Sequence, residues 1–80
     1  MEDMESYHKR LRAARMRSKG AVYDIIDHKG QRLIAFPQHN GVFRLPPDGE
    51  ALMARIVESY EKQVEIAFTF DGELTIVSID

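Results

Sequence analysis

The residues that could perform chemistry are scattered along this chain of 80 residues. It has three histidines, His8, His28 and His39, and no cysteine. None of its serines lies in a context typical of the sharp turn that exposes a catalytic nucleophile. Asp27 and His28 are neighbours on a predicted strand, where successive side chains point to opposite faces, so they cannot easily share a metal ion. The pattern predicts a non-enzymatic protein with no metal site and no cofactor.

One charged segment needs a specific explanation. Residues 7–20 contain six cations and no acid, although the whole chain has a net charge of −2. The six cations are Lys9, Arg10, Arg12, Arg15, Arg17 and Lys19. Residues 1–20 therefore have a net charge of +3, and residues 21–80 a net charge of −5. We predict two parts: a basic N-terminal helical arm over residues 1–19 and a β-rich domain over residues 20–80.

The six cations of this arm form the candidate binding site for a charged partner. Arginine predominates, which suits bidentate contacts with carboxylate or phosphate but does not choose between them. The arm could dock on an acidic patch of a protein partner or of a neighbouring subunit. It could instead neutralise phosphates of a nucleic acid with little sequence preference, or simply be a solvated helix. Because the acidic domain would repel nucleic acid, protein recognition is favoured and nucleic-acid binding is the alternative.

The composition indicates a single small globular domain. The chain is 44% hydrophobic and 30% charged, and its length is near the lower limit for a self-sufficient core. Without cysteines, self-association is the remaining common means of reinforcing such a core. No apolar run approaches the roughly 18 residues of a membrane span, and the acidic start followed by a basic stretch is the wrong order for a secretory signal. We therefore expect a cytoplasmic protein with no membrane partner.

Three dipeptides that end in glycine mark turns between predicted strands: Lys29-Gly30, Asn40-Gly41 and Asp71-Gly72. Asn-Gly and Asp-Gly are strong signals of two-residue hairpins, because both central positions of a type I′ turn have positive φ. The intervening runs are rich in β-branched and aromatic residues. They predict a three-stranded meander in residues 21–45 and a hairpin in residues 64–79.

The registers set by these turns place one series of apolar side chains on a common face, which we interpret as the core. In the meander, this face contains Tyr23, Ile25, Ile34, Phe36, Phe43 and Leu45. In the last hairpin, Phe68 lies opposite Thr75 and Ile66 opposite Val77. The aromatic residues are thereby assigned to the core and not to an exposed surface for stacking bases.

The opposite face is also apolar, which is unusual for an antiparallel sheet with one side in water. Its large residues are Val22, Ile26, Leu33, Val42, Leu74 and Ile76. The arm offers only the thin stripe Met4, Tyr7, Leu11 and Ala14 to cover it. We therefore predict that this face mediates self-association into a homodimer or a higher oligomer.

Residues 46–63, PPDGEALMARIVESYEKQ, predict a helix between the meander and the hairpin. Asp48 is the candidate N-cap after two prolines. The core-facing stripe of this helix consists of Leu52, Met53, Ile56, Val57 and Tyr60. The predicted fold is thus α+β and mostly β, with an N-terminal helix followed by three strands, a helix and two strands.

This order of elements resembles the OB-fold, a five-stranded antiparallel Greek-key barrel with a helix between its third and fourth strands. Residues 50–80, EALMARIVESYEKQVEIAFTFDGELTIVSID, are also similar to the final third of bacterial pentameric toxin B-subunits. Those subunits are secreted and typically disulfide-bonded, so their glycan binding is not transferred to this chain. An open antiparallel sheet covered by one helix is the structural alternative.

Overall fold

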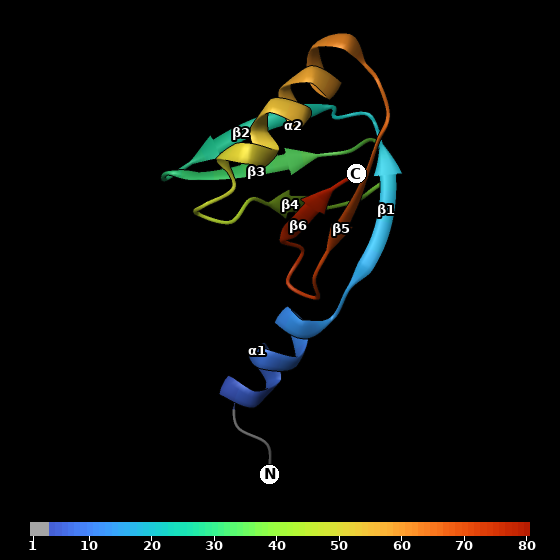
Figure 1. Cartoon of the computed structure of the whole chain (residues 1–80). Coiled ribbons are helices and arrows are strands. Elements are labelled where there is room, and N and C mark those ends of the chain that lie inside the picture. Colours follow the sequence, from blue (N-terminus) through green and yellow to red (C-terminus); the bar gives the residue numbers. More distant parts are fainter. Residues whose placement is uncertain (1–3) are drawn as a thin grey trace.

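The computed structural model describes residues 4–80 and has an α+β fold (Figure 1). Its two helices are α1 (Met4–Ala13) and α2 (Glu50–Lys62). Its six strands are β1 (Met16–Gly20), β2 (Asp24–His28), β3 (Gln31–Ala35), β4 (Val42–Arg44), β5 (Ile66–Phe70) and β6 (Ile76–Ile79). They form two open antiparallel sheets of three strands each, β1–β5–β6 and β2–β3–β4, and the described strands do not close a five-stranded barrel.

The N-terminal segment differs from its prediction, because the helix ends at Ala13 and the second half of the arm is a strand. Strand β1 pairs antiparallel with β5, from Met16 opposite Phe70 to Gly20 opposite Ile66. The hydrogen-bonding edge of β5 is a tertiary feature, and tertiary context overrides the helical tendency of an Arg-rich segment. The expectation of a helical arm through residue 19 is therefore wrong for residues 16–19.

The first predicted hairpin is confirmed. Lys29 and Gly30 have φ values of 52° and 80°, the positive values of a type I′ turn. Ile25 lies opposite Ile34 and Asp27 lies opposite Arg32, as this turn requires. A two-residue loop therefore determines the register of β2 on β3.

The turn at Asn40-Gly41 is longer than predicted. A two-residue turn would place Gln38 opposite Phe43, but Ile34 lies there, so a loop over residues 36–41 replaces this turn. The observed register differs from the predicted one by an even number of residues. Because side chains alternate between the two faces of a strand, each residue stays on its predicted face of the sheet. Phe36 and Phe43 are consequently buried as predicted.

Tyr23 does not belong to the core, although its alternation with Ile25 predicts that it does. Residues 21–23 lie between β1 and β2 and outside both strands. In this bend Val22 is fully buried and Tyr23 is 69% exposed. The bend interrupts the alternation, so the predictions for these two side chains are reversed.

The turn at Asp71-Gly72 is also longer than two residues. The Asp71 carboxylate accepts hydrogen bonds from the backbone N–H groups of Glu73 and Thr75, at 2.8 and 3.0 Å. Phe68 pairs with Ile79, and an irregularity after Thr69 shifts the register by one residue. Because such a shift moves side chains to the other face, Ile76 is fully buried and its predicted outward orientation is wrong.

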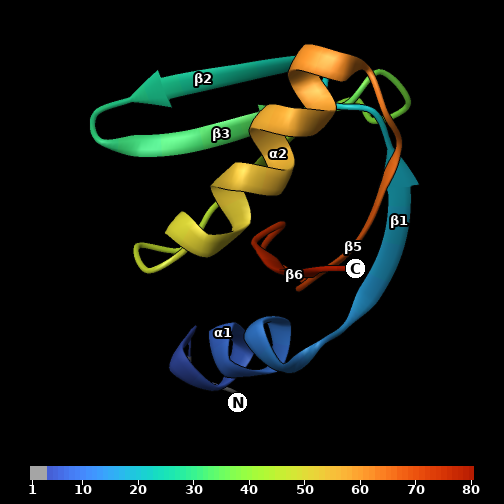
Figure 2. The same cartoon turned by 45° about the horizontal axis from the view of Figure 1, so that its top comes forward.

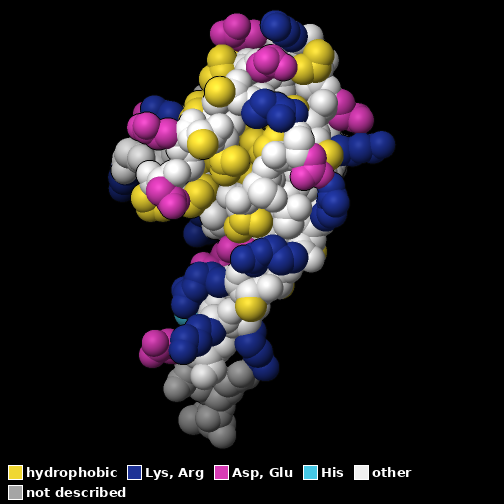
Figure 3. Space-filling view, in the orientation of Figure 1, with side chains coloured by type: hydrophobic (Ala, Val, Ile, Leu, Met, Phe, Trp, Pro, Cys, Tyr) yellow, Lys and Arg dark blue, Asp and Glu magenta, His cyan; other side chains and the backbone are white. Residues whose placement is uncertain are grey.

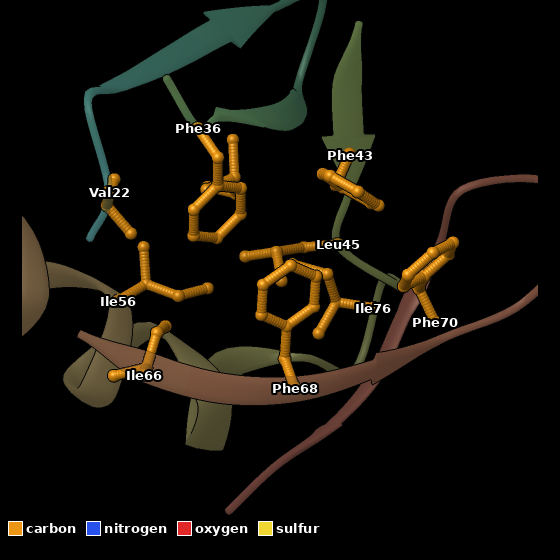
Figure 4. Packing of buried hydrophobic residues seen from close by; sticks show 10 residues of the cluster. Val22, Phe36, Phe43, Leu45, Ile56, Ile66, Phe68, Phe70 and Ile76 are labelled. Carbon is orange, nitrogen blue, oxygen red and sulfur yellow. The ribbon is translucent and has the colours of Figure 1, made fainter. Parts of the chain in front are cut away.

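A single apolar core lies between the two sheets and α2 (Figure 4). Its buried residues are Val22, Ile34, Phe36, Phe43, Leu45, Ile56, Ile66, Phe68, Phe70 and Ile76. The Phe36 and Phe68 rings are stacked with centroids 4.6 Å apart, and Phe43 lies edge-on to Phe68 at 5.2 Å. The assignment of these aromatic rings to the core is confirmed.

Helix α2 packs against β5 and β6, with Ile56 fully buried and Leu52 and Met53 packed against the core. It begins at Glu50, with Gly49 as N-cap and no side-chain cap, so the predicted cap at Asp48 is wrong. The predicted apolar stripe is correct at Leu52, Met53 and Ile56, but Tyr60, which was predicted to face the core, is 43% exposed. Figure 2 shows α2 beside the β2–β3 hairpin, with α1 on the far side of the molecule.

Candidate functional site

The six cations of the predicted binding site are divided between α1, β1 and the link that joins them. Lys9, Arg10 and Arg12 lie on α1, Arg15 follows this helix, and Arg17 and Lys19 lie on β1. All six are exposed. Figure 3 shows Lys and Arg side chains gathered along the part of the molecule that α1 forms.

The cations on β1 already have carboxylate partners within the chain. Arg17 forms an ion pair with Asp80, and Lys19 Nζ lies 3.9 Å from Glu65 Oε1. All four side chains are more than half exposed, and exposed ion pairs typically stabilise a fold by only about 0–1 kcal/mol. These cations are therefore partly neutralised by the domain itself.

Arg15 serves the end of α1. Its guanidinium donates hydrogen bonds to the carbonyl oxygens of Arg12 and Ala14. A cation at this position interacts favourably with the carbonyl end of the helix dipole. Arg15 thus has a structural role at the end of α1.

The α1 helix contacts the domain near its C-terminal end. The Gly72 N–H donates to the Leu11 carbonyl at 2.7 Å, and a Cβ on Gly72 would lie 2.9 Å from Leu11 Cδ2. Arg12 Nη1 is 3.7 Å from Glu73 Oε1, a buried oxygen with no hydrogen-bond partner among the described residues. The close approach to Gly72 therefore joins α1 to the β5–β6 turn.

The remainder of α1 is unusually exposed for a helix with apolar residues. No residue of α1 is buried. Met4 and Tyr7 are 67% and 47% exposed, and with Leu11 they have the spacing of one helix face. The helix thus presents an apolar stripe with Arg10 and Arg12 on its two flanks, whereas the helical period places Lys9 on the opposite side.

The predicted self-association face is not assembled as expected. Val22 and Ile76 lie in the core, Leu33 and Val42 are half-buried, and only Ile26 and Leu74 are exposed. The bend before β2 and the shift in β6 turn the first two side chains inward. The outer surface is accordingly less apolar than the alternation indicates.

A second exposed apolar group lies at the opposite end of the molecule and was missed by sequence reasoning. Tyr23, Tyr60 and Val64, here called the far-end patch, are among the exposed large apolar residues. Hydrogen bonds join the backbone segments that carry these residues. Val22 N–H donates to Ser59 Oγ at 2.9 Å, and this hydroxyl donates to the Val64 carbonyl at 2.6 Å. Gln63 Nε2 donates to the carbonyl oxygens of Val22 and Tyr60. No local signal predicts this grouping, because it joins the bend at residues 21–23 to the end of α2.

Four exposed carboxylates neighbour the residues of the far-end patch in the sequence. Asp24 follows Tyr23, Glu58 and Glu61 flank Tyr60 along α2, and Glu65 follows Val64. All four acids are exposed. Lys62 and the partner of Glu65, Lys19, are the nearby cations, so carboxylates are in excess at this end.

The structure also brings together Ser18 and His39, which sequence reasoning treated separately. Ser18 Oγ lies 2.9 Å from His39 Nε2, and the His39 ring is edge-on to Phe43 with centroids 5.0 Å apart. In residues 4–80, no carboxylate is hydrogen-bonded to His39 to orient it as a catalytic base. The same part of the chain contains no group of three or more potential metal ligands. The pair attaches the loop 36–41 to β1.

Comparisons of the chain with protein-family models, with curated proteins and with solved structures find no match. Neither helix in residues 4–80 is long and apolar enough to cross a membrane.

Proposed function

We propose that this chain is a small non-catalytic binding protein, an adaptor, whose basic arm recognises an acidic surface on a protein partner. The observation that carries the proposal is the composition of exposed α1, with Arg10 and Arg12 on the flanks of the stripe that contains Met4 and Tyr7. An apolar stripe flanked by cations suits a protein surface in which apolar contacts supply burial and carboxylates supply orientation. Self-association and a cytoplasmic location are part of this proposal.

Nucleic-acid binding is the alternative use of the same cations. Phosphate neutralisation needs several cations that face the strand without nearby acids. Here Arg12, Arg17 and Lys19 lie within 4 Å of a carboxylate of the domain. Those carboxylates would repel a phosphate backbone, and the exposed Met4 offers no group that binds phosphate. Protein recognition is therefore favoured.

We also propose an OB-like arrangement, in which the two sheets are the halves of one barrel. Support comes from β1 and β2, which only three residues separate. Further support comes from a parallel bridge between Arg44 and Thr75, where Arg44 N–H donates to the Leu74 carbonyl at 2.7 Å. Slow hydrogen exchange of the Arg44 amide would agree with this closure, and exchange at the rate of an exposed loop would contradict it.

Capture from native lysate, with and without nuclease, tests the proposed partner class. The arm variant K9Q/R10Q removes two exposed cations from α1. The matched control, K29Q/R32Q, removes two exposed cations from the β2–β3 hairpin and changes the net charge equally. We expect the wild-type chain and the control to retain the same proteins after nuclease treatment, and the arm variant to lose them.

The outcomes separate the two candidate functions. Capture that disappears with nuclease, together with random oligonucleotide binding that weakens by orders of magnitude between about 50 and 200 mM salt, would assign the arm to nucleic acid. Equal protein capture by the arm variant and the control would refute recognition through α1.

A further inference from the structure

The two ends of the molecule have complementary surfaces. Helix α1 and the C-terminal end of α2 lie at opposite ends of the molecule (Figure 1). Helix α1 carries cations and exposed apolar residues, and the C-terminal part of α2 carries Tyr60 of the far-end patch. We propose that the chain associates head to tail, with α1 of one copy docked on the far-end patch of the next copy. The inference rests on the proposed function, because it identifies a second copy of the chain as an acidic partner of the arm.

The first argument is that α1 lacks the burial that normally stabilises a short helix. It has ten residues, none of them buried. Isolated helices shorter than about 12–15 residues are marginal in water, and most helical stability in proteins comes from packing an apolar face. The face with Met4 and Tyr7 is available for such packing.

The second argument is that the far-end patch is a preorganised surface. The fully buried Ser59 hydroxyl links the Val22 backbone to the Val64 backbone, and Gln63 adds a hydrogen bond between the same two segments. Tyr23 and Tyr60 are therefore presented by a cross-linked backbone, which reduces the entropy lost when a partner docks. Exposed tyrosines supply large contact area at low conformational cost.

The third argument is charge complementarity. On α1, Lys9, Arg10 and Arg12 outnumber the single described acid, Glu5. Around the bend at residues 21–23 and the C-terminal end of α2, the four exposed carboxylates Asp24, Glu58, Glu61 and Glu65 outnumber Lys19 and Lys62. Opposite potentials favour this pairing and disfavour the contact of two arms or of two patches.

Helix α1 cannot reach the far-end patch of its own chain. The molecule is 48 Å long, and α1 and the C-terminal end of α2 occupy its opposite ends in Figure 1. Strand β1, which connects α1 to the bend at residues 21–23, is paired along β5 and so holds the two surfaces apart. The contact must therefore form between copies, and such heterologous contacts give open chains or closed rings.

Complementation between two defective variants tests this geometry. The arm variant Y7A/R10A removes one apolar side chain and one neighbouring cation from the proposed docking face of α1. The patch variant Y60A/E61A removes one apolar and one acidic contact from the far end, and neither variant creates a new complementary charge. Sedimentation velocity over a concentration series, on nuclease-treated protein, is the measurement.

We expect the average mass of the wild-type chain to rise with concentration and each variant to associate about tenfold or more weakly. An equimolar mixture of the two variants should form a species of two chains, because one intact arm meets one intact patch and growth then stops. The control I26S, on the outer face of β2, should assemble like the wild-type chain. Circular dichroism shows whether each variant remains folded.

Three results would overturn the proposal. A wild-type chain that remains monomeric at every concentration would refute head-to-tail association. The proposed function would still be supported if nuclease-treated lysate yields captured proteins. Assembly that I26S alone abolishes would assign self-association to the sheet face. Two folded variants that both stay monomeric, separately and mixed, would exclude head-to-tail docking.

Discussion

Replacement of Ser59 is the most direct test of how α2 is joined to the bend at residues 21–23. The Ser59 hydroxyl is fully buried on α2, accepts a hydrogen bond from Val22 N–H and donates one to the Val64 carbonyl. Replacement S59A removes both bonds and adds no steric conflict, because alanine is smaller than serine. Helix propensity favours alanine by a few tenths of a kcal/mol, which works against the loss.

The cost of S59A follows from what the two backbone groups lose. Val22 is fully buried, so its N–H is left without a partner, and an unsatisfied buried donor costs about 1–3 kcal/mol. Val64 is exposed, so water can replace Ser59 at its carbonyl and the loss there is small. We expect S59A to lower the free energy of unfolding by about 1.5–2.5 kcal/mol, a substantial share of the total for a small domain.

Urea denaturation followed by circular dichroism measures this loss, with an unchanged m-value as the sign that the unfolding transition is the same. The matched control is S78A on β6, an exposed serine that should change stability by less than about 0.5 kcal/mol. Equal stability of S59A and S78A would refute the reasoning, because it would mean that Val22 N–H finds another partner or is not buried.

Three further substitutions examine single features of the fold. G72A places a Cβ 2.9 Å from Leu11 Cδ2, so we expect the free energy of unfolding to fall by about 1–3 kcal/mol and hydrogen exchange in α1 to become faster. Unchanged exchange in α1 would contradict the close approach of Gly72 to Leu11. K29G replaces a lysine at φ 52° in a type I′ turn and should raise the free energy of unfolding by about 1 kcal/mol at most. A lower free energy of unfolding would argue against positive φ at this position. R17Q removes the exposed pair with Asp80 and should cost less than about 1 kcal/mol, with a smaller difference from wild type at high salt; a larger, salt-independent loss would indicate a buried role.

Several elements of the fold are readable from short stretches of sequence because local physics determines them. Lys29-Gly30 forms the predicted type I′ turn, since two residues with positive φ suffice to reverse a strand. Helix α2 has Ile56 at its core position because apolar residues recur with the period of a helix. At Asn40-Gly41 the observed and predicted registers differ by an even number of residues, which does not change the face on which a side chain lies. Phe36 and Phe43 are therefore buried as predicted, although the predicted turn is wrong.

The candidate site is only partly readable in this way. The six cations and the apolar positions Met4 and Tyr7 are evident from sequence. Their division into a projecting helix and a paired strand is not, because β1 pairs with β5, whose residues follow β1 by about fifty positions. The far-end patch depends in the same way on a hydrogen bond between Val22 and Ser59.

The sequence by itself determined the α+β composition, the first hairpin, the second helix and the separation of a basic segment from an acidic domain. The tertiary structure alone decided that residues 16–20 form a strand, that Val22 and Ile76 turn inward and that Tyr23 turns outward. The physical reason is the range of the interactions. Turns and helices depend on neighbouring residues, whereas edge pairing, bends and bulges depend on backbone groups that only the folded chain brings together.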